Sequence, residues 1–219
     1  MSADPAYPAR DRYADRKEAA SYDARRFRSL RGRVVDRREQ ALIARALAAV
    51  APPLERLLDL PAGTGRLAAL LGARAPSVLG ADRSREMLRQ GAKYDGLAVQ
   101  AEAARLPFPD RAFDAVVSLR LMGHLPPDER RAVLAEMRRV TRRFLVIAFY
   151  DSTPWTRLRR RLGSRLRRGP WYAEPLARTR RELDGLGFQV RLALPLARFI
   201  SETWIFVLER PDPEPERRR

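Results

Sequence analysis

Residues 57–68 read Leu57-Leu58-Asp59-Leu60-Pro61-Ala62-Gly63-Thr64-Gly65-Arg66-Leu67-Ala68. This order predicts a buried strand, a tight turn and the start of a helix. Gly63 and Gly65 let the backbone approach a ligand where a Cβ would clash, and the helix start offers unpaired N–H groups to an anionic group. Asp82 ends the next apolar run, where an acid is placed to hydrogen-bond ribose hydroxyls. The stretch therefore predicts a site for a cofactor that contains a ribose.

The chain around this turn alternates apolar runs with helix-like stretches. The runs expected to be strands are Leu57–Leu60, Val78–Ala81, Leu97–Gln100, Phe113–Leu119, Phe144–Tyr150, Phe188–Leu194 and Thr203–Leu208. The expected helices are Gly65–Ala73, Ser84–Ala92, Pro127–Val140 and about 173–185. Such alternation predicts an α/β fold with a parallel sheet and helices on both faces. Only a short loop joins the last two strands, so this pair must be antiparallel.

The glycine turn alone leaves two cofactor classes open. Residues 63–68 also satisfy the Gly-x-Gly-x-x-Ala fingerprint of dinucleotide sites, so an NAD(P)-dependent oxidoreductase is an alternative. Asp59 opposes it, because a carboxylate just before the turn repels a pyrophosphate. The same carboxylate can accept a hydrogen bond from the ammonium group of an amino acid.

Four stretches narrow the choice: Asp59–Gly65, Ala81–Leu88, Glu102–Asp110 and Phe113–Leu125. In these stretches the chain resembles the class I S-adenosylmethionine (SAM)-dependent methyltransferases, in particular the type 11 group that includes ubiquinone/menaquinone-type enzymes. The Leu106-Pro107-Phe108 element followed by Phe113-Asp114 is the most specific part of the resemblance. The resemblance covers residues 39–150 well and the two closing strands more loosely.

The resemblance implies a fold, a cofactor and a set of contacts. The fold is a Rossmann-like three-layer sandwich, with a seven-stranded, mostly parallel sheet of order 3-2-1-4-5-7-6 and an antiparallel last strand. The cofactor is S-adenosyl-L-methionine, with Asp82 on the ribose, Met87 against the adenine and Glu102 at the adenine edge. The implied cofactor-binding residues are Asp59, Leu60, Pro61, Ala62, Gly63, Gly65, Asp82, Arg83, Met87, Glu102, Ala103, Ser118 and Leu119.

The chain departs from the family pattern at three positions. Pro61 stands where the first motif has its first glycine, Glu102 where an Asp or Asn is usual, and Gly123 where many relatives have a histidine. We still expect cofactor binding with these departures, but they weaken any inference of the acceptor substrate from the substrates of the family.

Methyl transfer from a sulfonium is an in-line displacement, so positioning of donor and acceptor can supply much of the rate. No metal is required, and none is predicted. His124, the single histidine of the chain, follows the fourth strand and is the candidate catalytic base. The alternative is that it caps its loop or packs against the next helix. Arg120 is expected to line the acceptor pocket or to be an exposed loop residue, and Tyr22 to be a lid or simple packing.

The chain is strongly basic. Its formal net charge is +17, and every basic residue except Lys17 and Lys93 is arginine, a skew that GC-rich coding can also produce. Residues 157–168 hold seven arginines and no acid. This segment is interpreted as a lid over an anionic acceptor, a membrane-surface helix, a nucleic-acid contact, or a solvated helix. The absence of a recognised nucleic-acid module disfavours a non-catalytic nucleic-acid-binding protein.

The expected organisation is one domain with two arms. Residues 1–20 are predicted to be a disordered or loosely helical arm, 21–210 the methyltransferase domain with a basic insertion at 151–172, and 211–219 a disordered tail. The N-terminal arm lacks the apolar region of a signal peptide, and the lack of cysteine fits a reducing cytoplasm. We therefore expect a cytoplasmic enzyme with a small-molecule or lipid-linked acceptor, which an arginine-rich protein can bind when it is anionic, and with possible peripheral membrane contact; the sequence leaves the oligomeric state open.

Overall fold

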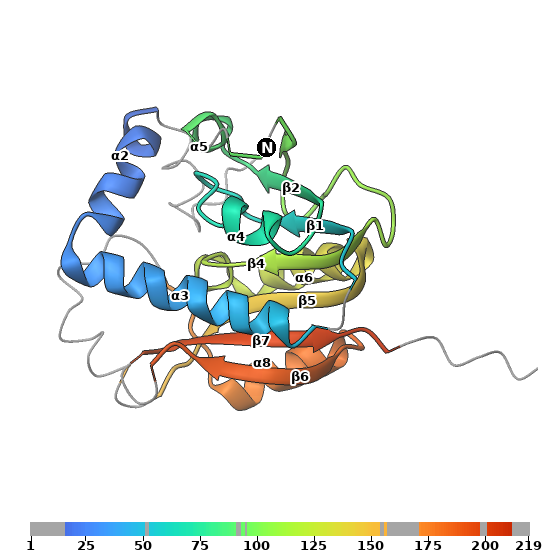
Figure 1. The fold of residues 1–219 in the computed structure, drawn as a ribbon. Coiled ribbons are helices and arrows are strands. Elements are labelled where there is room, and N and C mark those ends of the chain that lie inside the picture. The colour runs from blue at the N-terminus through green and yellow to red at the C-terminus, as the bar shows by residue number, and fades with distance from the viewer. Residues whose placement is uncertain are drawn as a thin grey trace, which may run out of the picture.

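The computed structural model describes residues 16–50, 53–90, 93–94, 96–153, 156, 171–197 and 201–211. The sheet consists of β1 (Arg56–Asp59), β2 (Ser77–Asp82), β3 (Ala98–Gln100), β4 (Phe113–Ser118), β5 (Thr141–Tyr150), β6 (Gln189–Pro195) and β7 (Thr203–Glu209). Its strand order is β3-β2-β1-β4-β5-β7-β6, as Figure 1 shows. This order confirms the predicted fold class.

The strands pair in the predicted directions. β1 is parallel to β2 and β4, β2 to β3, and β4 to β5. β7 is antiparallel to both β5 and β6. The parallel strands thus end at one edge of the sheet, which is the edge where ligands bind in doubly wound folds.

The helices are α2 (Arg16–Phe27), α3 (Leu30–Ala48), α4 (Ala68–Gly72), α5 (Arg85–Gln90), α6 (Pro127–Val140) and α8 (Leu176–Gly185), with a 3₁₀ turn η1 (Met122–His124). α6 has the predicted bounds. α2 and α3 were not among the expected helices, and α2 crosses the expected boundary at residue 20. The burial of Ile43, Ala46 and Leu47 at helical spacing is a signal for α3, as is Ser29, whose hydroxyl accepts from Gly32 N at its start.

Two apolar cores lie on opposite faces of the sheet. α6 and α8 cover one face, and α3 and α4 cover the other (Figure 1). Neighbouring strand residues serve different cores: Leu58 faces the α6 side and Leu57 the α3 side. Because helices cover both faces, the parallel strands are continuous apolar runs, and such runs could be predicted as strands from the sequence.

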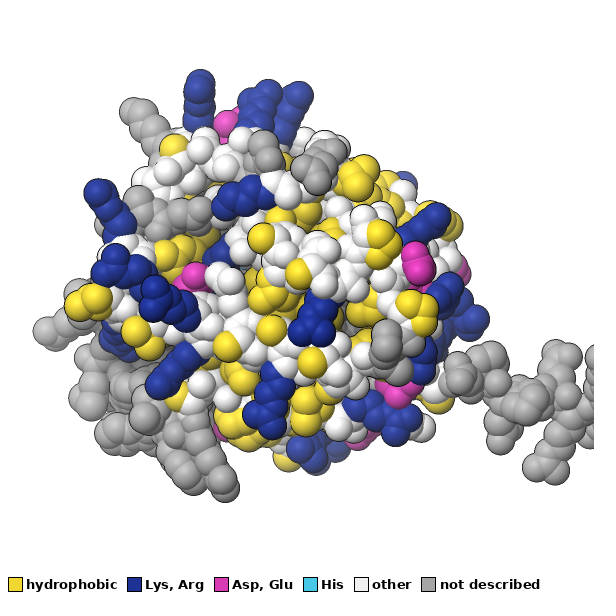
Figure 2. Space-filling model, viewed as in Figure 1, with side chains coloured by type: hydrophobic (Ala, Val, Ile, Leu, Met, Phe, Trp, Pro, Cys, Tyr) yellow, Lys and Arg dark blue, Asp and Glu magenta, His cyan; other side chains and the backbone are white. Residues whose placement is uncertain are grey.

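Lysine and arginine side chains outnumber acidic ones over the face drawn in Figure 2. In the part of the chain that the structure describes, no helix is long and apolar enough to cross a membrane. The arginine-rich segment 157–168, residues 1–15 and the expected tail from 212 onward lie outside the described residues. The predictions made for those segments stay predictions.

Candidate cofactor and active site

A cavity of about 810 Å³ opens at the carboxyl edge of the parallel strands. Residues from the ends of β1, β2 and β4, from η1 and α6, and from α2 line it. Of the predicted site residues, the structure brings these to the cavity: Asp59, Leu60, Pro61, Ala62, Gly63, Asp82, Arg83, Met87, Glu102, Ala103, Leu119 and His124. Gly65 and Ser118 do not line it. Gly65 shapes the turn at φ +71°, and Ser118 is buried behind the wall with no hydrogen-bond partner for its hydroxyl.

The glycine turn and the acid beyond it form one unit. Gly63 has φ +54°, a conformation that favours glycine. Its N–H donates to Asp82 Oδ2 at 2.8 Å, and Ser84 N–H donates to Asp82 Oδ1 at 2.8 Å. Burial raises the pKa of Asp82, and these two hydrogen bonds act in the opposite direction. The turn therefore holds the Asp82 carboxylate at the cavity wall. Its remaining lone pairs can accept hydrogen bonds from the two hydroxyls of a diol.

Asp59 is buried at the end of β1 and pairs with Tyr94, which lies in the loop between α5 and β3. Tyr94 donates its hydroxyl to Asp59 Oδ2 at 2.5 Å. Burial raises the pKa of the Asp59 carboxyl to about 7, while the bond from Tyr94 and the nearby Arg66 lower it. The Tyr94 ring packs so closely on β2 that a Cβ at Gly80 would lie 2.7 Å from it. Tyr94 matches no sequence motif, so its role was missed.

Glu102 is half exposed and ion-paired with Arg83 at 2.7 Å. The side chain of Glu102, which is longer than the usual Asp, thus reaches Arg83 directly after the end of β2. Met87 is buried on α5, with its Cε 3.6 Å from the Cβ that a side chain at Gly63 would carry. An adenine placed between Met87 and Glu102 would meet an apolar wall on one side and a paired charge on the other.

A buried acid of α3 fastens this helix to the cavity wall. Glu39 on α3, 4% exposed, accepts from Arg120 at 2.6 and 3.0 Å and pairs with Arg66 at 3.1 Å. Asp36 also binds Arg66. The Phe27 ring at the end of α2 lies 5.3 Å from both guanidinium groups. Sequence reasoning missed Glu39 and Asp36, because neither belongs to a motif and α3 was not expected.

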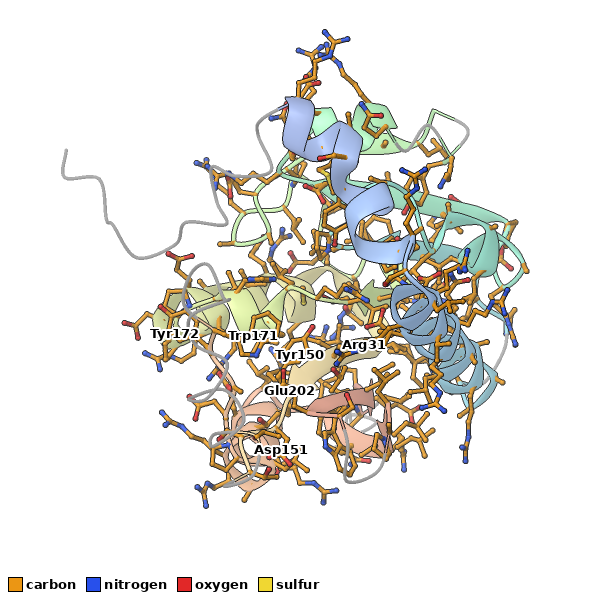
Figure 3. All side chains as sticks on the ribbon, turned by 90° about the vertical axis from the view of Figure 1, so that its left-hand side faces the viewer. Arg31, Tyr150, Asp151, Trp171, Tyr172 and Glu202 are labelled. Carbon is orange, nitrogen blue, oxygen red and sulfur yellow. The ribbon has the colours of Figure 1, made fainter. Side chains whose placement is uncertain are left out.

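His124 lines the cavity and packs on an aromatic wall. Its ring meets Trp171 edge-on at 4.8 Å, and Trp171 meets Tyr150 at 4.4 Å. Figure 3 shows Tyr172, Trp171 and Tyr150 following one another across this edge of the sheet. A Cβ at Gly123 would lie 2.7 Å from Trp171 and 2.8 Å from Tyr150. The glycine that departs from the family pattern is thus the residue that lets this wall close.

A family model of the methyltransferase domain matches residues 57–143. The demethylmenaquinone methyltransferase of Thermotoga maritima is 42% identical over 93 residues, which are 41% of this chain and 40% of that protein. The enzyme of the same name from Beutenbergia cavernae is 40% identical over 109 residues, 48% of this chain and 45% of the relative. The chain thus matches less than half the length of these two relatives.

Solved structures of the same fold extend over most of the chain. The magnesium protoporphyrin IX methyltransferase of Synechocystis, solved with bound S-adenosylhomocysteine (SAH), has a TM-score of 0.70 at 18% identity and covers 90% of this chain and 98% of its own. A possible histamine N-methyltransferase of Thermotoga maritima has a TM-score of 0.65 at 14% identity, over 88% of this chain and 99% of its own. Residues 57–143 thus match a methyltransferase domain and the chain shares the fold of these two solved structures, which confirms the predicted resemblance.

Proposed function

We propose that this chain, built on a class I SAM-dependent methyltransferase domain, binds SAM in the cavity and methylates a small-molecule or lipid-linked acceptor. The observation that carries the proposal is the Asp82 carboxylate, held by Gly63 and Ser84 N–H at the wall of the cavity. The matched relatives are named demethylmenaquinone methyltransferases, which supports a quinone-like, lipid-linked acceptor.

The proposed cofactor contacts follow the walls of the cavity. Asp82 accepts from the ribose hydroxyls, Met87 packs on the adenine, and the region of Glu102 and Ala103 meets the adenine edge. The backbone of residues 60–65 borders the methionine part, and Asp59 receives its ammonium group. Each of these residues except Gly65 lies at the cavity wall, so one ligand can reach them together.

The acceptor is proposed to enter on the side of His124, Arg120 and Leu121. When bound, SAM supplies an electrophilic methyl group, which needs a nucleophile held in line with it. The aromatic wall of Trp171 and Tyr150 fixes the ring of His124. That ring is the proposed acceptor of a proton from an acidic hydroxyl or carbon. Arg120, held by Glu39, places a positive charge at the same end.

The test is calorimetric titration of the purified chain with SAM, SAH and NADH. We expect micromolar binding of the two adenosyl ligands, weakened about 100-fold or more in Asp82→Ala, because two ribose hydrogen bonds to a charged group are lost. Asp128→Ala, an exposed acid of α6, is the matched control and should bind like the wild type. Binding of NADH in place of the adenosyl ligands would overturn the proposal in favour of a dehydrogenase.

The cellular location is part of the same proposal. A cytoplasmic site of action fits the lack of cysteine, and a lipid-linked acceptor would be reached there from a membrane surface.

A further inference from the structure

One face of α3 is exposed and carries aliphatic side chains among arginines. Leu30 is 75% exposed and Val34 50% exposed, one helical turn apart. Arg33, Arg37, Arg38 and Arg45 are also exposed, at spacings that place them on the same face of the helix as these two residues. We call these six residues the α3 patch. Figure 2 shows arginines and hydrophobic side chains side by side at the left, where α3 begins in Figure 1.

The charges of α3 are sorted between its two faces. Its two acidic residues, Asp36 and Glu39, point inward to Arg66 and Arg120 at the cavity wall. The exposed face therefore presents arginines with no acid of the same helix among them. GC-rich coding can account for the number of arginines, but it does not account for why both acids lie on the inner face or why two aliphatic side chains protrude.

We propose that the α3 patch docks on the surface of an anionic lipid bilayer. Arginines attract anionic headgroups, and protruding aliphatic side chains insert at the headgroup–acyl boundary. A nucleic acid would use the arginines but would leave Leu30 and Val34 in water, and the patch has no aromatic residue on which a base could stack. Leucine and valine beside arginine thus favour a lipid surface.

The patch also lies beside the cavity. Phe27, three residues before α3, packs on Arg66 and Arg120, both of which line the cavity. A bilayer touching Leu30 would therefore face the end of α2 that packs on two arginines of the cavity wall. This step rests on the proposed function, since it gives a lipid-linked acceptor a short path from the membrane to the methyl donor.

The test is co-sedimentation of the full chain with vesicles. One set contains about a third phosphatidylglycerol in phosphatidylcholine and the other contains phosphatidylcholine alone, at about 50 and about 500 mM NaCl. We expect binding to the anionic vesicles that is largely lost at high salt. Arg33→Gln/Arg37→Gln should weaken it about 25-fold, or about fivefold for each arginine, and Leu30→Ser/Val34→Ser about tenfold.

Arg180→Gln/Arg181→Gln is the matched control, because it removes two exposed arginines from α8 on the opposite face of the sheet. Equal sedimentation with both vesicle types, or patch variants that bind like the wild type, would overturn the proposal. So would patch variants that lose binding to a single-stranded RNA while keeping vesicle binding.

SAH titration of each variant separates this inference from the proposed function. Normal SAH binding without vesicle binding overturns the membrane inference alone. Patch-dependent vesicle binding without SAH binding in the wild type supports the docking surface and overturns the methyltransferase proposal instead.

Discussion

Replacing Tyr94 with phenylalanine removes a single hydroxyl from the buried end of β1. In the wild type this hydroxyl donates to Asp59 Oδ2 at 2.5 Å, and the pKa of Asp59 is about 7 because of burial. The charged groups that face this carboxylate are Arg66, which lowers its pKa, and Asp82, which raises it. Without the hydroxyl, only Arg66 opposes the effect of burial, so Asp59 holds its proton to a higher pH.

The size of the effect follows from the strength of such a bond. A hydrogen bond to a charged group contributes about 1.5–3 kcal/mol, so the pKa of Asp59 in the variant should rise to about 8–9. At pH 7 about 1–10% of Asp59 is then ionised, against about half in the wild type. A ligand that needs the carboxylate for its ammonium group should bind about 5- to 50-fold more weakly at pH 7 and recover most of this loss by about pH 8.5.

Calorimetry with two ligands isolates the mechanism. SAH carries the amino-acid ammonium, and 5′-methylthioadenosine lacks it, so Tyr94→Phe should weaken only SAH. Tyr172→Phe, at a tyrosine outside the cavity lining, is the matched control. Equal weakening of both ligands would show that the Tyr94 hydroxyl supports the cavity as a whole and not the ammonium site at Asp59. A loss of SAH affinity that stays constant between pH 7 and 8.5 would refute the role of Asp59 protonation.

Two further predictions concern stability. The pKa of folded Asp59, about 7, lies above the unfolded value of about 3.9, so this group favours folding at low pH and the benefit is lost as pH rises through 7. In urea unfolding, the stability of Asp59→Asn relative to the wild type should increase by roughly 2–3 kcal/mol between pH 5 and 8; parallel curves would contradict this. Gly123→Ala should lower the free energy of unfolding by about 1–3 kcal/mol, because its Cβ would lie 2.7 Å from Trp171, whereas Gly72→Ala has nothing within 4 Å and should change it little. An unchanged free energy of unfolding in Gly123→Ala would mean that Trp171 and Tyr150 can move aside for the new methyl group at little cost.

The sequence predicted those parts of the fold that depend on local pattern. Buried strands are continuous apolar runs, and a glycine turn needs its glycines, so the strands and the turn before Asp82 could be anticipated, whereas the sheet order came from the family resemblance. The contacts that were missed join residues far apart: Tyr94 and Asp59 are separated by 35 positions, and Arg120 and Glu39 by 81. No periodicity or motif records such a pair, because only the folded sheet brings them together.

The same distinction explains why net charge alone is a poor guide to function here. Arg66 and Arg120 are bound to the acids of α3 at the cavity wall, so they fasten a helix and shape one side of the cavity. The arginines of the α3 patch face outward beside exposed Leu30 and Val34. One helix thus gives its acids to the cavity and its bases to the surface. The charge of +17 therefore indicates an anionic partner only where the fold leaves arginines without acids beside them, and on α3 that place is next to the cavity.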